Sequence, residues 1–241
     1  IQRNLYGVDL DRFAVNIARL RLWLSLIVEY ETDAAHPQPP PLPNLAFKVE
    51  VGDSLTGPAP GQLQPDLFHH RQVQDYFRLK GEFMTAHGPR KLSLREEIEA
   101  LQAEISAWAG DGNEGGFDWA GQFAEIYTDQ TPTVPGTREV QRVPGTVGAS
   151  GGTGFDVVLT NPPYVRQELL DAGLKETLKA RYPQVYRGTA DLYVYFYARA
   201  LHLLREGGVA SFISSNKWLR AGYGKKLRRH LGREAAVEAI L

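Results

Sequence analysis

The chain has 241 residues, and its composition, 43% hydrophobic and 23% charged, is ordinary for a folded globular protein. It contains no cysteine, which excludes disulfides, thiol catalysis and cysteine-based zinc sites, and its six histidines fall in no metal-ligand spacing. No apolar run reaches the length of about 18 residues that a membrane span needs. No secretory signal opens the chain, so the sequence predicts a cytoplasmic protein.

The formal net charge of −1 is distributed unevenly along the chain. Residues 161–241 hold 14 of the 27 Lys and Arg and 7 of the 28 Asp and Glu, a balance of +7 against −8 in residues 1–160. A basic C-terminal third is typical of a protein that binds a polyanion. Solvated helix faces would give the same count.

The first predicted elements are a strand, an acidic residue and a helix. Residues 5–10 form a short apolar run that predicts a buried strand ending in Asp9, and Asp11 is a suitable N-cap for the next element. From 13 to 28, apolar residues recur at helical spacing and predict a broadly buried helix. This order is typical of the second unit of a Rossmann-like nucleotide domain, where an acid at the strand tip can accept hydrogen bonds from both ribose hydroxyls. Alternatively, Asp9 is a solvated turn residue.

A second strand follows a proline-rich segment. Residues 36–43 predict a stiff extended connector, and residues 47–51 alternate as a strand. The sequence Gly52-Asp53-Ser54-Leu55 ends this strand. An Asp-Ser pair in this position can bind a ligand or can cap the turn for purely local reasons.

Residues 57–154 interrupt the alternation of strands and helices. Residues 68–84 predict a helix, residues 87–90 a turn, and a capping-box pattern at Ser93 and Glu96 a second helix. We expect an antiparallel helical hairpin, and then a Gly-, Thr- and Pro-rich stretch from 128 to 154 that should be mobile. The second helix carries a narrow apolar seam, which indicates packing and not a cofactor site: Leu94, Ile98, Leu101, Ile105 and Trp108.

The next strand ends in a turn of unusual chemistry. Residues 155–159 predict a buried strand, which the two prolines after Asn161 must end because they lack N–H groups. The Asn161 side-chain oxygen and the Pro162 carbonyl can accept hydrogen bonds from an exocyclic amino group, which draws that nitrogen toward a tetrahedral shape and frees its lone pair. Pro163 adds rigidity, and Tyr164 can stack on a base taken out of its helix. A strand that ends in a Pro-Pro turn with an Asn cap is the alternative.

Asn-Pro-Pro-Tyr after an apolar strand resembles the catalytic motif of S-adenosylmethionine-dependent amino methyltransferases. The wider resemblance is to the large DNA adenine-N6 methyltransferases of type IIG restriction-modification and phage-defence systems, and it spans nearly the whole chain. It implies methyl transfer from S-adenosylmethionine to adenine N6, with double-stranded DNA carrying a flipped adenine as the partner. It also implies that Asp9 binds the cofactor's ribose and that Asp53 binds the amino group of its adenine.

Three further segments are similar to segments of these enzymes: the insertion, Phe117-Asp118-Trp119 with residues 123–127, and Asp191-Leu192-Tyr193. The sequence gives no chemical role to residues 117–127. The family's first strand and glycine-rich cofactor loop should precede Leu5, yet no Gly-x-Gly occurs in the first thirty residues. We therefore expect an internal fragment that is inactive alone, and that either closes the gap in its sheet or self-associates.

The segment after Tyr164 supplies the DNA-binding candidates. Arg166 and Gln167 can touch a phosphate or a base edge, or they begin a solvated helix. Residues 190–204 predict a helix with a glycine C-cap at Gly207-Gly208, and residues 209–213 and 236–241 predict strands. After residue 213, small residues, an exposed aromatic at Trp218 and a basic helix start suit phosphate contact. The candidates are Arg166, Asn216, Lys217, Arg220 and Lys225.

The sequence as a whole predicts an α/β protein with a Rossmann-like class I methyltransferase sheet and a helical hairpin insertion. Residues 1–56 would be a partial cofactor-binding half, residues 57–154 the insertion with a flexible loop, and residues 155–241 the catalytic half. Other functions stay open: methylation of cytosine N4, of a release-factor glutamine amide or of guanine N2 in ribosomal RNA, and a catalytically incomplete DNA-binding module. The long insertion, the 117–119 segment and the basic loop favour DNA.

Overall fold

The computed structural model describes residues 4–28, 42–60, 67–109, 116–128 and 153–240. The chain divides into two compact units, residues 1–151 and 152–241. Most of the predicted connector 36–43 and of the predicted mobile stretch 128–154 lies outside the described residues. The three-part division of the chain stays a prediction. No helix in the described ranges is both long and apolar enough to cross a membrane.

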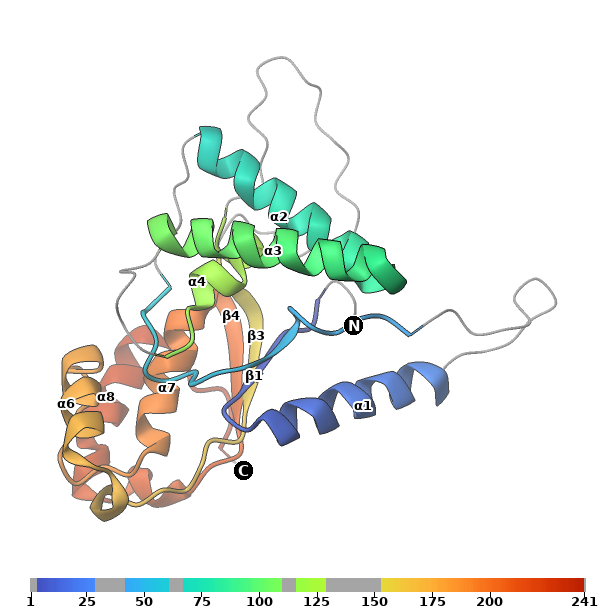
Figure 1. The fold of residues 1–241 in the computed structure, drawn as a ribbon. Coiled ribbons are helices and arrows are strands. Elements are labelled where there is room, and N and C mark those ends of the chain that lie inside the picture. Colours follow the sequence, from blue (N-terminus) through green and yellow to red (C-terminus); the bar gives the residue numbers. More distant parts are fainter. Residues whose placement is uncertain (1–3, 29–41, 61–66, 110–115, 129–152, 241) are drawn as a thin grey trace. The chain divides into compact units, whose positions relative to one another are not determined.

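The first unit opens with the predicted strand, helix and strand (Figure 1). Strand β1 (Gly7–Asp9) pairs in parallel with β2 (Val49–Val51), with Asp9 opposite Val51. Helix α1 (Arg12–Val28) connects them. The Asp11 carboxylate accepts a hydrogen bond from Phe13 N at 2.7 Å, which confirms it as the cap of this helix.

Two predictions for this region are wrong. Helix α1 is not broadly buried: Val15 is its one buried residue in the described structure, and Phe13 is 70% exposed. The reason is that α1 packs on the strand pair with one side, so its other apolar side chains meet solvent. The second strand begins at Val49 and not at residue 47, because Phe47 has a φ of 63°, in the left-handed region that strands exclude.

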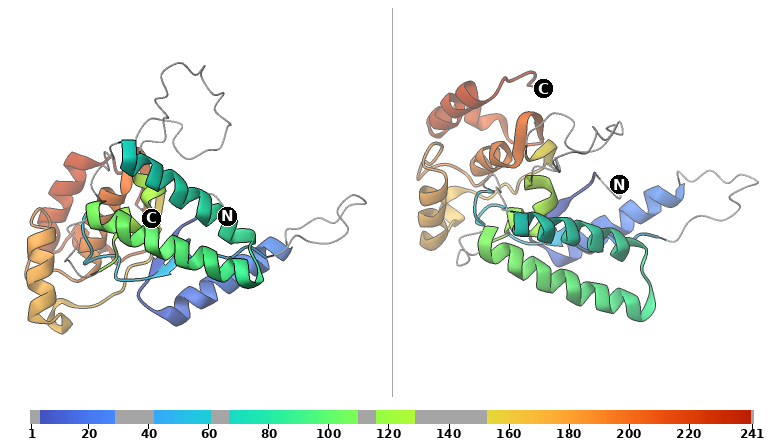
Figure 2. Two further views of the ribbon diagram at one scale, coloured as in Figure 1. Left: turned by 45° about the horizontal axis from the view of Figure 1, so that its top comes forward. Right: turned by 90° about the horizontal axis from the view of Figure 1, so that it is seen from above.

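The insertion contains the predicted helical hairpin. Helices α2 (Leu67–Thr85) and α3 (Gly88–Ala109) lie side by side in both views of Figure 2. Short helices α4 (Trp119–Gln122) and α5 (Ala124–Tyr127) follow. Residues Leu94, Ile98 and Ile105 are fully buried, so the predicted seam is confirmed as packing.

Helix α3 begins five residues before the predicted capping box, and that prediction is wrong. Gly88 adopts a φ of 59° at the helix start, and Pro89 suits a first turn because its missing N–H would be unpaired there. Ser93 thus lies inside the helix, and its hydroxyl donates to Glu97 at 2.7 Å.

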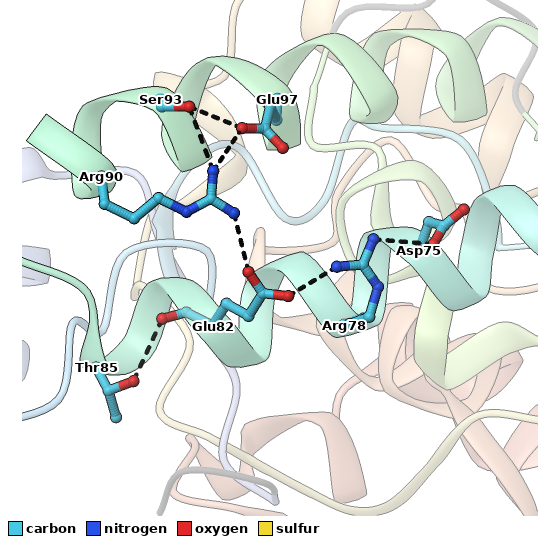
Figure 3. Close-up of polar contacts among 7 residues, drawn as sticks. All are labelled: Asp75, Arg78, Glu82, Thr85, Arg90, Ser93 and Glu97. Carbon is cyan, nitrogen blue, oxygen red and sulfur yellow. Dashed lines mark hydrogen bonds and ion pairs between the residues drawn. The ribbon is translucent and has the colours of Figure 1, made fainter.

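A charged network closes the hairpin on its surface (Figure 3). Arg90 of α3 contacts Glu82 of α2 at 3.0 Å and Glu97 of its own helix at 2.9 Å. Arg78 pairs with Glu82 at 2.7 Å and with Asp75 at 3.1 Å. These side chains are about half exposed, so solvent screens their attraction and their contribution to stability is small.

A second, buried network ties the insertion to the strands. The Glu125 carboxylate of α5 contacts the ammonium groups of Lys80 at 2.7 Å and of Lys48 at 3.6 Å, and it accepts a hydrogen bond from the Tyr6 hydroxyl at 3.1 Å. Burial acts to raise the pKa of Glu125, but the two ammonium groups outweigh it and hold that pKa below its ordinary value. Helices α2 and α5 are thereby fixed to the chain next to β1 and β2.

The second unit is also built on a parallel strand pair. Strand β3 (Phe155–Thr160) pairs with β4 (Leu204–Phe212), and α6 (Ala172–Arg181) and α7 (Tyr193–Leu203) lie between them in the chain. The single-turn helices η1 (Gln167–Leu169), η2 (Asn216–Leu219) and η3 (Gly222–Gly224) lie in loops, and α8 (Lys225–Glu234) follows. Helix α7 packs against both strands, and α8 packs against α7. Both units are therefore of mixed α/β type, compatible with a methyltransferase fold.

Two predictions about secondary structure in residues 204–240 are wrong. Gly207-Gly208 does not cap a helix, because α7 ends at Leu203 and β4 begins at once. Leu204 pairs with Phe155 and Val209 pairs with Val157, so β4 bulges between these positions, and Gly207 adopts the required φ of 72°. Residues 236–240 form no strand, since no described strand lies beside them to pair with.

Candidate active site

The two predicted cofactor-binding acids lie at one edge of the first unit. Because β1 and β2 are parallel, Asp9, the last residue of β1, and Asp53, which follows β2, both lie at the carboxyl end of a strand. The backbone N–H of Gly52 donates to the Asp9 carbonyl at 2.9 Å, which holds the two strand ends together. The structure therefore brings both residues to the place where ligands bind in α/β sheets.

Asp9 is exposed and keeps capacity to bind a ligand. One of its carboxylate oxygens accepts a hydrogen bond from Asp11 N at 2.8 Å. Within the described residues, no hydrogen-bond donor reaches its other oxygen. A carboxylate with one free oxygen at a strand tip fits the hydroxyls of a ribose.

The Asp53 carboxylate is largely occupied by its own turn. One oxygen accepts from Leu55 N at 2.9 Å and from Thr56 N at 3.2 Å, and the other accepts from the Thr56 hydroxyl at 2.6 Å. A carboxylate offers about four lone-pair positions, so one acceptor position remains for an amino group. The local capping role and the binding role are thus compatible.

A cavity of about 550 Å³ opens beside this turn. Its volume is within the range of small-molecule sites. Asp53 lines it and Asp9 does not. The wall is acidic, and burial raises the pKa of its Glu50 above the ordinary value. The other lining residues come from β2 and the residues flanking it, from α3, and from α4 and the segment before it: Phe47, Val51, Gly52, Glu99, Gln102, Gly116, Phe117, Asp118 and Gln122.

The Asn161 turn follows β3 directly, as predicted. The Asn161 side chain is exposed, and within the described residues it has no hydrogen-bond partner, whereas Pro162 is buried. The buried proline ring fixes the turn while leaving the amide beside it open to solvent. This arrangement presents an amide oxygen and a rigid backbone to a ligand.

The Tyr164 side chain is fixed by its hydroxyl group, while its ring is exposed to solvent. Its hydroxyl donates to the Ile213 carbonyl at 3.2 Å, while 57% of the side chain is exposed. Ile213 follows β4, so the contact joins the turns after the two paired strands. The exposed ring is available for stacking on a flat ligand.

One positioning residue was missed from the sequence. The Asp191 carboxylate accepts a hydrogen bond from Gln167 N at 3.2 Å, and Leu192 N donates to the Val165 carbonyl at 2.9 Å. Both bonds hold the segment that follows Tyr164. The resemblance of residues 191–193 to a family segment was the signal, but the pairing across 24 residues could not be inferred from it.

The predicted DNA-binding side chains are exposed and lie in the second unit. Ile213 N donates to the Thr160 carbonyl at 3.1 Å, so the segment after β4 starts beside the Asn161 turn, as predicted. One predicted feature of this segment is wrong: Trp218 is not exposed but 8% accessible, and its ring packs on Tyr197 at 5.4 Å. The exposed candidates are Arg166, Asn216, Lys217, Arg220 and Lys225.

The basic residues after Trp218 do not all face solvent. Arg228 of α8 donates to the carbonyls of Trp218 and, at 3.2 Å, of Ala221. These bonds close the backbone of η2 and η3 and fix the loop that carries the basic side chains. Arg228 is therefore structural, and nothing in its sequence context separates it from its exposed neighbours.

Three relatives show what the chain is similar to. It is 45% identical over 83 residues to the type II methyltransferase M.XhoI of Xanthomonas vasicola, which covers 34% of this chain and 15% of that protein. It is 46% identical over 87 residues to the type II methyltransferase M.BstVI of Geobacillus stearothermophilus, which covers 36% of this chain and 15% of that protein. It is 25% identical over its whole length to a protein of Methanocaldococcus jannaschii provisionally named a type II restriction enzyme and methyltransferase, of which it covers 24%.

The chain thus spans about a seventh to a quarter of the length of these curated relatives. The family model described as Eco57I restriction-modification methylase matches residues 3–241, which includes both strand pairs, the insertion and the Asn161 turn. The chain therefore belongs to the Eco57I restriction-modification methylase family.

Proposed function

We propose that this chain forms part of a site-specific DNA methyltransferase that transfers a methyl group to N6 of adenine, within a type II restriction-modification or phage-defence enzyme. Family membership and the type II methyltransferases among its relatives support the reaction class. The observation that carries the proposal is the Asn161 turn. The Asn161 side chain is exposed and has no hydrogen-bond partner among the described residues, and the proline that follows it is buried.

The Asn161 oxygen and the Pro162 carbonyl are the acceptors for the two N–H bonds of the amino group. Accepting both bonds moves electron density onto the nitrogen and opposes its delocalisation into the ring. The prolines keep these acceptors in place, so little reorganisation is needed when the reaction occurs. Tyr164 stacks on the base, and its hydroxyl bond to Ile213 keeps the ring near the turn.

The cofactor in this proposal is S-adenosylmethionine, held in a Rossmann-like domain. When bound, it would supply a methyl group on a positively charged sulfonium: the nitrogen–carbon bond forms as the sulfur–carbon bond breaks, the sulfur leaves as a neutral thioether without an acid, and the methylated nitrogen loses one proton to solvent. Asp9 accepts from the ribose hydroxyls with its free oxygen. Asp53 accepts from the adenine amino group with the acceptor position that its turn leaves open.

The macromolecular partner is double-stranded DNA with the target base flipped out. Arg166, Lys217, Arg220 and Lys225 contact phosphates, and Asn216 contacts a phosphate or a base edge. The exposure of all five side chains supports this assignment. The shared edge of β3 and β4 supports it too, because the Asn161 turn and the start of the basic segment meet there.

The test uses the full-length protein, DNA and S-adenosylmethionine labelled in its methyl group, followed by digestion of the DNA to nucleosides. We expect label in N6-methyladenine and none with Asn161→Ala. Asn16→Ala is the matched control, since Asn16 is an exposed asparagine of α1 that the proposal assigns neither to the cofactor nor to DNA. Unchanged labelling in the Asn161 variant would overturn the assignment of this turn.

Methylation of cytosine N4 is the second candidate, because the same two acceptors serve any exocyclic amine. Label in N4-methylcytosine would establish it and would leave the role of Asn161 unchanged. Label in protein or RNA alone would favour the glutamine-amide or guanine-N2 reactions. DNA binding without any transfer would favour a catalytically incomplete module.

A further inference from the structure

The segment before α4 touches the Asp53 turn through two hydrogen bonds on successive carbonyls. Phe117 N donates to the Asp53 carbonyl at 2.8 Å. The indole N–H of Trp119 donates to the Ser54 carbonyl at 3.2 Å, across 65 residues of sequence. These bonds fix the backbone of the turn from outside, whereas the Asp53 side chain fixes it from within.

The same segment packs so closely against the turn that three positions have no room for a Cβ atom. A Cβ at Gly52 would lie 2.5 Å from the Phe117 ring, and a Cβ at Gly57 would lie 2.0 Å from the Phe117 carbonyl oxygen. Gly116 has a φ of 103° and runs against the backbone of Gly57. The two chain segments therefore cross in direct backbone contact.

The segment is itself rigidly held within the first unit. Phe117 is 5% exposed and Trp119 8% exposed, and their rings meet edge to face at 5.2 Å, with Phe123 in contact with both. Asp118 caps α4 by accepting from Gly121 N at 2.9 Å. The following helix is fixed by the buried pair of Glu125 and Lys80. A displacement of the turn would have to disturb this cluster.

We propose that Phe117 and Trp119 are positioning residues that hold the Asp53 turn in the shape that binds the cofactor. This inference rests on the proposed function, in which Asp53 accepts from the cofactor's adenine. It gives residues 117–119 a role in methyl-donor affinity and makes the insertion part of the cofactor site. Neither ring touches the reacting atoms in this role.

The discriminating experiment compares two tryptophan substitutions in the full-length protein. Trp119→Phe keeps an aromatic ring and removes the N–H that reaches Ser54. Trp108→Phe is the matched control, because the Trp108 indole N–H donates instead to the Gln72 side chain within the hairpin, at 3.2 Å. The affinity for S-adenosylmethionine is measured by calorimetry, and thermal unfolding without cofactor is measured beside it.

We expect Trp119→Phe to weaken cofactor binding on the order of fivefold, the loss of one hydrogen bond's net contribution, and Trp108→Phe to change it less than twofold. The KM for the methyl donor should rise with Trp119→Phe, while kcat at saturating donor and the KM for DNA stay unchanged. Wild-type affinity in Trp119→Phe, or equal weakening in both variants, would overturn the inference.

A second pair guards against a folding defect in the tryptophan variant. Phe117→Leu removes the ring that lies on Gly52 but keeps the backbone bond to Asp53. Phe212→Leu is the control: it changes a ring of β4, in the second unit, that stacks on Tyr197 with the ring centroids 4.0 Å apart. Only Phe117→Leu should weaken cofactor binding by more than its loss of thermal stability accounts for. If the wild-type protein binds no S-adenosylmethionine, the proposed function itself is contradicted.

Discussion

The Asp53 turn and the Asn161 turn each follow a strand of a parallel pair, yet they hold their polar side chains in different ways. Asp53 binds two N–H groups and a hydroxyl of its own turn. Asn161 has no partner among the described residues, and its turn is stiffened by the two prolines after it. Local hydrogen bonds use up acceptor capacity, whereas proline rigidity leaves it free. In the proposed function, Asp53 serves structure and binding together, and Asn161 serves chemistry alone.

The strongest test of this contrast is Asn161→Ala. We expect methyl transfer to fall by at least about 100-fold, the scale of losing one preorganised hydrogen-bonding group at a reacting atom. Amide hydrogen exchange in residues 153–165 should stay at the wild-type rate, because the side chain holds none of the described structure. Faster exchange there would show that Asn161 is a structural cap, and the contrast would fail.

Asp53→Ala should, unlike Asn161→Ala, change the local structure of its turn. Loss of the three local hydrogen bonds should destabilise the turn by about 1 to 2 kcal/mol, the usual cost of removing a capping side chain. Amide exchange at Leu55 and Thr56 should therefore accelerate roughly tenfold. Asp53→Asn is the control, because its amide oxygen can still accept from both N–H groups, so exchange should stay near the wild-type rate.

Two half-buried histidines should make the second unit sensitive to acid. Burial lowers the pKa of His202 below 6.5, and the charges of Arg199 and His230 lower it further. Burial also lowers the pKa of His230, although the Glu234 carboxylate opposes this. The unfolded chain thus binds more protons than the folded one just below pH 6.5, so this stability is full above that pH and is lost as the pH falls.

This loss of stability can be measured by monitoring the unfolding of the second unit through amide hydrogen exchange in α7 between pH 5 and 8. His202→Gln should flatten the pH dependence, because a glutamine cannot charge in this range. A variant as acid-sensitive as the wild type would assign the effect to other groups. The Asp53 turn, which belongs to the first unit, should show no matching change in exchange over this range.

The smallest effect is expected at the surface of the hairpin. Arg90→Ala removes the contacts to Glu82 and Glu97, but all three side chains are about half exposed. Neither the unfolding temperature nor the cofactor affinity should change measurably. A clear loss of affinity would mean that the surface network, and not the buried segment at residues 116–119, holds the Asp53 turn.

The sequence was most informative where neighbouring residues determine the outcome. The strand tip at Asp9 and the end of β3 before Asn161 follow from apolar runs and from proline chemistry, which act within a few residues. The predicted hairpin follows from helical spacing. The start of α3 was misplaced because Pro89, which suits a first turn, was assigned to the preceding turn while Ser93 offered a plausible cap.

The remaining errors concern contacts between distant residues. Trp218 is buried because α7 brings Tyr197 against it, and Gly207 lies in a bulge because Phe155 pairs with Leu204. The role of residues 117–119 depends on backbone contact with Gly52 and Gly57, about sixty residues earlier in the chain. Local propensity carries no information about such pairs.

The buried Lys48–Glu125–Lys80 network also limits how this protein can be engineered. A minimal catalytic core with the insertion trimmed away would lose Glu125 and would leave the Lys48 ammonium in an apolar setting without its carboxylate. Transferring only β1 and β2 into another scaffold would also separate Lys48 from Glu125. Any chimera should therefore move residues 4–128 as one block and place its junctions outside that block.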